Sequence, residues 1–177
     1  MESETGVEKT DKSQPAKYKE LDKEELLSIL ESHKIWLQSD GTEGNQANLS
    51  GVNLKGTALV GASLQNAIFK KAYLYGAYLK RSNLKGADLS EANLRGANLR
   101  WSDLQNATLT AANLTRADLM KTDLRKADLT KVQNLSCEQL NSSFIDKSTK
   151  LPDYISVSWT SETEYECKKV QHKQKED

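Results

Sequence analysis

Hydrophobic residues recur every five positions between Gln46 and Thr130. The fourth place of each five-residue unit is Leu in sixteen of seventeen consecutive units, and Phe69 is the exception. The second place is Ala in twelve units. In the other five units it is Val52, Thr57, Ser82, Ser102 or Thr122. Asn or Asp usually fills the third place, so the pattern indicates one repeated structural unit.

This period fits neither the 3.6-residue turn of a helix nor a continuous strand with a period of two. Within one unit, however, the Ala and Leu positions are two residues apart, which is the same-face spacing of extended chain. Asn, Asp and Gly suit turns, because Asn and Asp bond their own backbone and Gly tolerates a positive φ. The pattern therefore predicts short extended segments joined by corners, with stacked coils that bury Ala and Leu.

Ahead of the repeats, residues 19–45 predict an N-terminal capping helix and a turn. Apolar residues within 21–37 fall on one helical stripe, and Asp22 followed by Glu25 matches a capping box. An open β-solenoid end exposes unpaired backbone, so we expect this helix to be a lid over the core rather than a partner-binding element. Residues 1–18 are polar and lack periodicity, which predicts a disordered tail.

After the repeats, residues 136–163 predict a C-terminal cap with a short helix and a strand. Ser136 and Gln139 form a capping-box signature at the start of the helix. Apolar and polar residues alternate over 155–159, which favours a strand that either lies along an edge of the coil stack or pairs between two chains. Residues 164–177 are polar and predict a second disordered tail.

The units GADLS, EANLR, GANLR and RADLM follow the motif A(D/N)LXX, and on this motif the chain resembles the pentapeptide repeat family. The run SCEQL…IDKSTKLPDY also resembles C-terminal segments of some members. The resemblance implies an all-β fold, a right-handed quadrilateral β-helix over residues 46–135 with four units per coil. Short helices would cap its two ends, and the rod would be about 20 Å long at the spacing of paired strands.

Some proteins of this family resemble B-form DNA and bind DNA gyrase, protecting it from quinolones, and typically dimerise through C-terminal elements. Such mimicry requires a dense negative surface. Residues 46–135 instead carry 13 Lys or Arg against 6 Asp or Glu, whereas both flanks are acidic. The basic repeats therefore disfavour a gyrase-binding mimic, which we keep as an alternative.

Composition excludes several classes of protein. Of the 177 residues, 37% are hydrophobic and 28% are charged, the net charge is zero, and the mean hydropathy is −0.70. No segment approaches the ~18 apolar residues that span a membrane, and the first residues do not resemble a secretory signal. We therefore expect a cytoplasmic protein without membrane contact. Two cysteines do not make a disulfide framework, so free thiols are expected at Cys137 and Cys167.

The sequence offers no evident catalytic or metal-binding constellation. His33 falls on the predicted helix, His172 falls in a polar tail, and their spacing from the two cysteines matches no zinc motif. Cys137 is expected to pack in the C-terminal cap rather than to act as a nucleophile. The aspartates occupy turn positions of the repeats. We predict a protein that is not an enzyme, with no cofactor and no metal.

Positions twenty residues apart would stack as ladders on the surface of such a rod. One ladder contains Lys80 and Arg100, and its neighbour contains Arg81 and Trp101, which would form a cation–π pair. Exposed aromatic and Arg residues are enriched at binding hot spots. The candidate binding face comprises Tyr73, Tyr75, Tyr78, Lys80, Arg81, Arg100 and Trp101.

Two interpretations of this face stand side by side. Either its cations only solvate the rod while the aromatic residues cover flat β surface, or the face contacts a partner. Because no catalytic site competes with it, we predict a non-catalytic interaction scaffold with a protein partner, as a monomer or as a dimer through the C-terminal segment. Weak nucleic-acid binding by the basic face is a further alternative, although the modest net charge makes nucleic acid an unfavoured partner.

Overall fold

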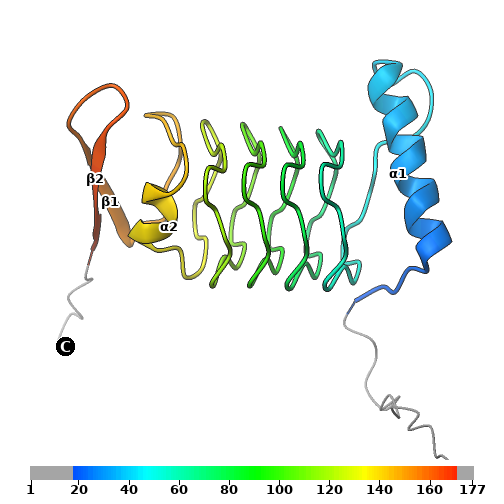
Figure 1. The fold of residues 1–177 in the computed structure, drawn as a ribbon, viewed down its shortest axis with the longest axis horizontal. Helices are drawn as coiled ribbons and strands as arrows, with labels where there is room; N and C mark the ends of the chain where they lie inside the picture. Colours follow the sequence, from blue (N-terminus) through cyan, green and yellow to red (C-terminus); the bar gives the residue numbers. More distant parts are fainter. Residues whose placement is uncertain (1–17, 171–177) are drawn as a thin grey trace, which may run out of the picture.

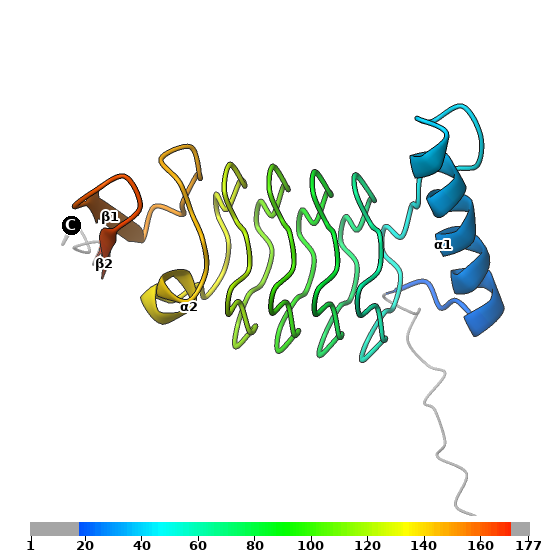
Figure 2. The same ribbon diagram turned by 45° about the horizontal axis from the view of Figure 1, so that its top comes forward.

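The computed structural model describes residues 18–170, which form a straight rod with one helix at one end and a small helix and a hairpin at the other (Figure 1). The elements are α1 (Lys23–Gln38), α2 (Cys137–Asn141), β1 (Ile155–Trp159) and β2 (Tyr165–Lys169). The repeats between α1 and α2 build the body of the rod, whose coils stack along its length (Figure 2).

Each coil formed by the repeats contains twenty residues, which confirms four units per coil. Parallel bridges join third-place residues of successive coils, such as Asn53 with Tyr73 and Asn93 with Asn113. Backbone amides bond across the same step, as from Leu54 to the carbonyl of Tyr73 at 2.8 Å. The rod therefore has four sides, which we number from the first four units: 46–50, 51–55, 56–60 and 61–65, with each later unit on the side of the unit twenty residues earlier.

Leucines of the fourth place fill the interior, and nearly all are fully buried, as is Phe69. The fourth side instead carries buried hydroxyls at the second place. Those of Ser82 and Ser102 donate to the carbonyls three residues before them, at 2.7 and 2.6 Å, and that of Thr122 donates to the Leu99 carbonyl at 2.7 Å. Burial without these bonds would be unfavourable, so the hydroxyls are accommodated because backbone acceptors lie within reach.

The first place of every unit from Gly51 to Lys131 forms a corner, with φ between +55° and +69°. Only glycine adopts this left-handed conformation without strain. The third-place side chain stabilises the turn that follows, as where the Asn93 side-chain oxygen accepts from the Arg95 amide at 3.1 Å and that of Asp103 accepts from the Gln105 amide at 2.9 Å. The predicted role of Asn and Asp as turn residues is confirmed.

Stacking continues beyond Thr130, where the repeat motif ends. Asp123 pairs with Phe144 and Asp128 pairs with Lys150, so the chain completes another coil after the sequence register is lost. In that coil α2 replaces the unit of the third side, which lengthens the step from twenty residues to twenty-one and then twenty-two. Gln139 ties α2 to the coil before it, because its amide donates to the carbonyls of Leu114 and Ala117.

At the N-terminal end, α1 begins with the predicted capping box between Asp22 and Glu25. Leu26, Ile29 and Leu30 of α1 pack against the core of the rod. His33 is fully buried, and its Nδ1 accepts a hydrogen bond from the Ala47 amide at 3.1 Å. Burial lowers the pKa of His33, an effect that interaction with the backbone of Gln65 partly offsets.

At the C-terminal end, β1 and β2 form an antiparallel hairpin. The predicted strand over 155–159 is confirmed, and within the described residues it pairs with β2 rather than with a coil of the rod. The prediction of disorder after residue 163 is wrong for β2, and residues 171–177 lie outside the described residues. Alternation accounts for the hairpin: Val157, Trp159 and Tyr165 pack against the core, whereas the intervening residues are exposed.

The prediction of free thiols is also wrong, because a disulfide joins Cys137, the first residue of α2, to Cys167 in β2. Their Cα atoms lie 5.5 Å apart, within the range that a disulfide spans. The sequence alone does not predict that β2 lies beside α2, because the two cysteines are thirty residues apart. The thiols meet because the fold lays β2 beside α2, where the Tyr165 hydroxyl also donates to the Leu140 carbonyl at 2.8 Å.

Candidate binding surface

Trp101 is the centre of the predicted binding face. The Arg100 guanidinium lies 4.8 Å from the Trp101 ring centroid, the Lys80 ammonium lies 4.9 Å from it, and the Arg81 guanidinium lies 5.6 Å from it. The predicted pair of Arg81 and Trp101 is therefore confirmed as a contact. Cation–π attraction holds cations within about 6 Å of such a ring, so the indole collects three positive groups.

The geometry of the coils explains why these residues meet. Lys80 and Arg81 stand at the corner between the third and fourth sides, and Arg100 and Trp101 stand at the same corner one coil later. Tyr78 precedes them on the third side and is 53% exposed. We call Tyr78, Lys80, Arg81, Arg100 and Trp101 the Trp101 surface.

The Trp101 surface is basic, and part of its charge is uncompensated. Arg100 pairs with Asp118 at 3.2 Å. Within residues 18–170, neither Lys80 nor Arg81 forms an ion pair. Trp101 is 37% exposed, so the surface presents an aromatic ring and two unpaired cations to the surroundings.

Tyr73 and Tyr75 form a separate group on the second side of the rod. Their rings stack with centroids 6.0 Å apart, and the ring of Tyr18 stacks on Tyr73 at 4.8 Å. Lys19 pairs with Val52 in parallel fashion, which lays the start of the described chain along the first coil. Tyr73 is therefore half-buried, and the prediction that residue 18 belongs to a disordered tail is wrong.

A cleft of about 540 Å³ adjoins Trp101 on the fourth side of the rod. The last coils supply its floor, and Thr163 and Tyr165 of the hairpin also line it. The sequence did not reveal this cleft, because residues 164–177 predict a disordered tail and leave Tyr165 without a position. The alternation of Tyr165 and Cys167 with charged residues is the signal that could have revealed it. The residues that line the cleft include Trp101, Lys121, Asp123, Arg125, Phe144 and Tyr165.

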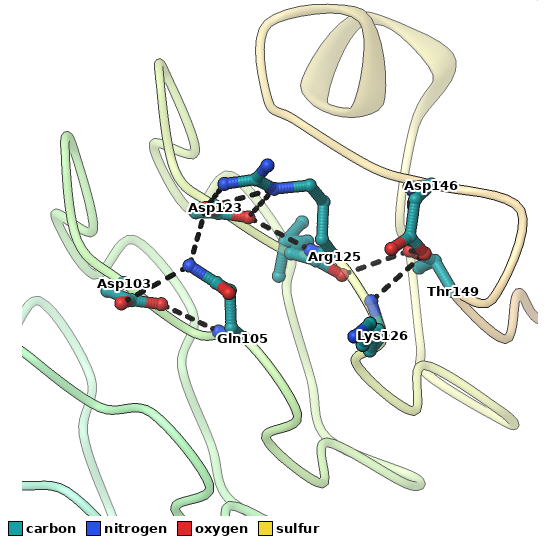
Figure 3. Close-up of polar contacts among 8 residues, drawn as sticks. Asp103, Gln105, Asp123, Arg125, Lys126, Asp146 and Thr149 are labelled. Carbon is teal, nitrogen blue, oxygen red and sulfur yellow. Dashed lines mark hydrogen bonds and ion pairs between the residues drawn. The ribbon is translucent and has the colours of Figure 1, made fainter. Parts of the chain in front are cut away.

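A polar network runs along the floor of the cleft (Figure 3). The Asp123 carboxylate accepts from the Arg125 guanidinium and from the Gln105 amide, the latter at 2.9 Å. Burial raises the pKa of Asp123, but the hydrogen bonds and charge of Arg125 and the hydrogen bond from Gln105 lower it by more. The pKa of Asp123 therefore lies below its ordinary value. Asp123 therefore stays ionised and neutralises Arg125.

The reactive residue types lie apart from one another. His33 is enclosed at the N-terminal end, and Cys137 is held in the disulfide at the other end. Among residues 18–170, no group of three or more His, Cys, Asp and Glu side chains is placed to hold a metal ion. In the same range, no helix is both long and apolar enough to cross a membrane.

A twenty-residue coil with a Leu and Ala interior defines the molecule as a four-sided β-solenoid. The sequence model of pentapeptide repeats matches residues 47–86, 72–110 and 97–133, with eight copies. The chain belongs to the pentapeptide repeat family, whose fold is the right-handed β-helix that the resemblance implied. A search of curated protein sequences finds no match.

Solved structures of the same family resemble the chain. A pentapeptide repeat protein from the thylakoid lumen of Arabidopsis thaliana is 36% identical, with 52% of this chain and 68% of that chain covered and a TM-score of 0.43. Rfr23 from the cyanobacterium Cyanothece 51142 is 30% identical, with 63% and 68% covered and a TM-score of 0.40. QnrB1, a plasmid-mediated fluoroquinolone resistance protein, is 18% identical, with 60% and 58% covered and a TM-score of 0.41.

Proposed function

We propose that this protein is a non-catalytic interaction scaffold that binds a protein partner through the Trp101 surface. A rigid rod with a filled interior offers its sides rather than a deep cavity, and recognition by surface side chains is the function that such a fold supports. The observation that carries the proposal is the exposed Trp101 ring, which has the cationic groups of Lys80, Arg81 and Arg100 within 5.6 Å of its centroid.

Trp101 occupies a corner with φ of +55°, where a bulky side chain is strained. Left-handed backbone costs a residue other than glycine about 1–2 kcal/mol. The same conformation recurs at every corner of the rod, where Gly61 and Gly96 avoid that cost and Arg81 and Lys121 bear it. Strain alone therefore does not single out Trp101. What sets this corner apart is a large aromatic ring that is 37% exposed and has three cationic groups within 5.6 Å of its centroid. Partner binding gives the exposed indole a role that stability does not.

The composition of the surface favours a protein partner. Aromatic residues and arginine dominate interface hot spots, because they combine large contact area with directed hydrogen bonds. Tyr78 and Trp101 supply the area, and Lys80 and Arg81 supply cations that lack an ion pair among residues 18–170. Tyr73 and Tyr75 lie on the adjoining side, where we propose that they extend the contact only at its margin.

The experiment compares wild type with a variant of the Trp101 surface in a pull-down from native lysate treated with nuclease. The variant carries Tyr78→Ser, Arg81→Asn, Arg100→Ser and Trp101→Asn; Asn is used at corners because Asn66 and Asn106 occupy equivalent ones. A control carrying Arg95→Ser and Lys131→Asn removes two cations from the second side. We expect a protein retained by wild type and the control and lost by the variant. Equal recovery by all three would refute the proposal.

The charge of the repeats bears on the two alternative functions, gyrase binding by a DNA mimic and nucleic-acid binding. A DNA mimic that binds gyrase needs a negative rod, whereas the repeats here carry an excess of Lys and Arg. Measurable inhibition of gyrase supercoiling by the purified protein would restore that hypothesis. Nucleic-acid binding by the basic face requires an affinity that falls with salt, and an oligonucleotide titration at two salt concentrations tests it.

We further propose that α1 and α2 with the hairpin act as caps. Each covers one end of the rod, and the hairpin turns a hydrophilic face outward, which opposes end-to-end association. Because β1 is paired within its own chain, we favour a monomer over a dimer formed through this segment. The cytoplasmic location stays a prediction, and the disulfide weighs against it, because disulfides persist mainly in oxidising compartments.

A further inference from the structure

The cleft beside Trp101 combines two exposed aromatic side chains. Phe144 is 54% exposed on its wall, although both neighbours in the sequence, Ser143 and Ile145, are buried. Phe144 stacks in the ladder after Asp123, so its side chain leaves the rod at a third-place position, which elsewhere is usually Asn or Asp. An exposed phenylalanine here adds nothing to the turn and offers apolar area to a ligand.

The spacing of the two rings suits extended chain. Phe144 stands two coil steps beyond the level of Trp101, since Asp103 pairs with Asp123 and Asp123 pairs with Phe144. Two steps correspond to roughly 10 Å, which is the rise of about three residues in a strand. An extended peptide segment of about four residues that runs along the rod can therefore span the distance between the two rings.

Charge in the cleft selects among anionic ligands. Lys121 stands at the corner one coil after Trp101, and within the described part of the chain it forms no ion pair. The Arg125 cation is already balanced by Asp123 on the floor, and Asp103 is a second carboxylate in the lining. A nucleic-acid backbone carries regularly spaced phosphates, some of which would face the Asp123 carboxylate. A peptide can place its few carboxylates next to the cations and place uncharged residues over the carboxylates on the floor.

We propose that the cleft binds an extended acidic segment of the partner protein, with an apolar side chain against Phe144 and a carboxylate near Lys121 or the Trp101 surface. This inference rests on the proposed function, because the cleft and the Trp101 surface share Trp101. The ligand class is an acidic peptide with one apolar anchor residue. The hairpin is part of the site, since Tyr165 lines the cleft opposite the coils.

The test uses fluorescently labelled synthetic peptides rich in Asp and Glu, with Leu, Ile, Phe, Tyr or Trp at the centre, titrated by fluorescence polarisation. Matched peptides carry Gly at the centre or Lys in place of the acids, and a thymidine oligonucleotide serves as a separate probe. The proteins are wild type, Phe144→Ser, Lys121→Asn and, as the control, Lys131→Asn at a corner of the second side. Circular dichroism melting checks that each variant folds.

We expect at least one apolar-centred acidic peptide to bind wild type, and Phe144→Ser to weaken it about tenfold, as truncation of a hot-spot side chain does. Lys121→Asn should weaken binding and reduce its salt dependence, whereas Lys131→Asn should change neither. Absence of binding by every acidic peptide up to about 1 mM, equal binding by Phe144→Ser, or tighter binding of the oligonucleotide would each overturn the proposal.

The lysate experiment separates this inference from the proposed function. A partner lost by the variant of the Trp101 surface but fully retained by Phe144→Ser would overturn the cleft and leave the scaffold function standing. A partner retained by both would overturn both proposals. Loss by both, together with competition by an acidic peptide, supports both.

Discussion

The two ends of the rod carry different elements (Figure 1). At the N-terminal end, one helix of 16 residues packs an apolar stripe on the core, and the His33 side chain accepts a hydrogen bond from the first coil. At the C-terminal end, α2 has 5 residues and the hairpin has two short strands, and a disulfide joins them. A long helix buries enough area to stay in place, whereas short elements need additional ties.

Side-chain bonds to the backbone make up the other ties at the C-terminal end. The Tyr154 hydroxyl donates to the Val132 carbonyl at 2.8 Å and accepts from the Leu135 amide at 2.9 Å. The Tyr165 hydroxyl donates to the Leu140 carbonyl at 2.8 Å. The C-terminal end therefore depends on specific bonds, while the N-terminal end depends on apolar packing and on one neutral imidazole.

Removal of the disulfide should have the largest effect. The Cys137→Ser and Cys167→Ser double variant loses a crosslink over a separation of 30 residues. Because the crosslink lowers the entropy of the unfolded chain, its loss should lower the free energy of unfolding by about 3–4 kcal/mol. We expect urea denaturation to show that loss, and a reductant to reproduce it in wild type but not in the variant. Hydrogen exchange should speed up over 155–169 and stay slow in α1. Uniform acceleration at both ends would contradict the division into two independent ends.

Gly44 tests the junction between α1 and the first coil. A Cβ atom at Gly44, where φ is +70°, would lie 2.3 Å from the Ser32 carbonyl oxygen and 2.8 Å from the Trp36 amide nitrogen. Gly44→Ala should destabilise the protein by about 2–3 kcal/mol through backbone strain and overpacking. Gly61→Ala, also at positive φ but with no atom within 4 Å, should cost only about 1 kcal/mol. Equal losses of stability for the two variants in thermal denaturation would show that the junction is no more sensitive to substitution than a corner of the rod.

The N-terminal end should be sensitive to pH. Burial holds the folded-state pKa of His33 below its ordinary value of 6.5, so the unfolded chain takes up a proton that the folded chain lacks. Stability is then complete above pH 6.5 and falls below it, by up to about 1.4 kcal/mol per pH unit. His33→Asn retains an acceptor for the Ala47 amide and should flatten that slope. A slope that persists in the variant would exclude His33 as its source.

Carboxylates act in a different pH window. The pKa values of Asp123, Asp128 and Asp146 lie below their ordinary value of 3.8, because hydrogen bonds to their charged forms outweigh the effect of burial. Their contribution to stability is present above 3.8 and is lost at more acidic pH. The His33 slope can therefore be measured without interference from these groups.

The smallest effect is expected at the side of the rod. Trp101→Gly relieves a left-handed residue and removes an exposed ring, so unfolding free energy should change by less than about 1 kcal/mol. Gly61→Trp at an equivalent corner should lower it by about as much. These two variants in chemical denaturation establish that the ends, not the corners, limit stability. A large loss in Trp101→Gly would instead assign Trp101 a structural role.

The repeats could be predicted from the sequence because each unit repeats the same local physics. Leu49 and Leu94 occupy equivalent environments, so one pattern fixes seventeen units. The second tail could not be predicted, because β2 is stabilised by its pairing with β1 and by Cys137, which lies thirty residues away in sequence. Helix α1 was predictable from its stripe and its capping box, both of which are local signals.

The candidate site was predictable only in part. A spacing of twenty residues is sufficient to bring Arg81 to Trp101, and the structure confirms that contact. Phe144 follows a step of twenty-one residues, because α2 interrupts the repeat, and no periodic rule places it beside Asp123. The stacking of Tyr18 on Tyr73 likewise depends on a segment that carries no repeat motif.

Because each coil of the repeats contains twenty residues, the number of repeats sets both how far a surface lies from α1 and which side of the rod carries it. An added block of twenty residues between α1 and Trp101 would move the surface about 4.8 Å further from that end while it kept pointing the same way. An added block of five would instead turn it by a quarter revolution, onto the neighbouring side. Gain or loss of repeats therefore changes the position and the direction of a binding surface only in discrete steps.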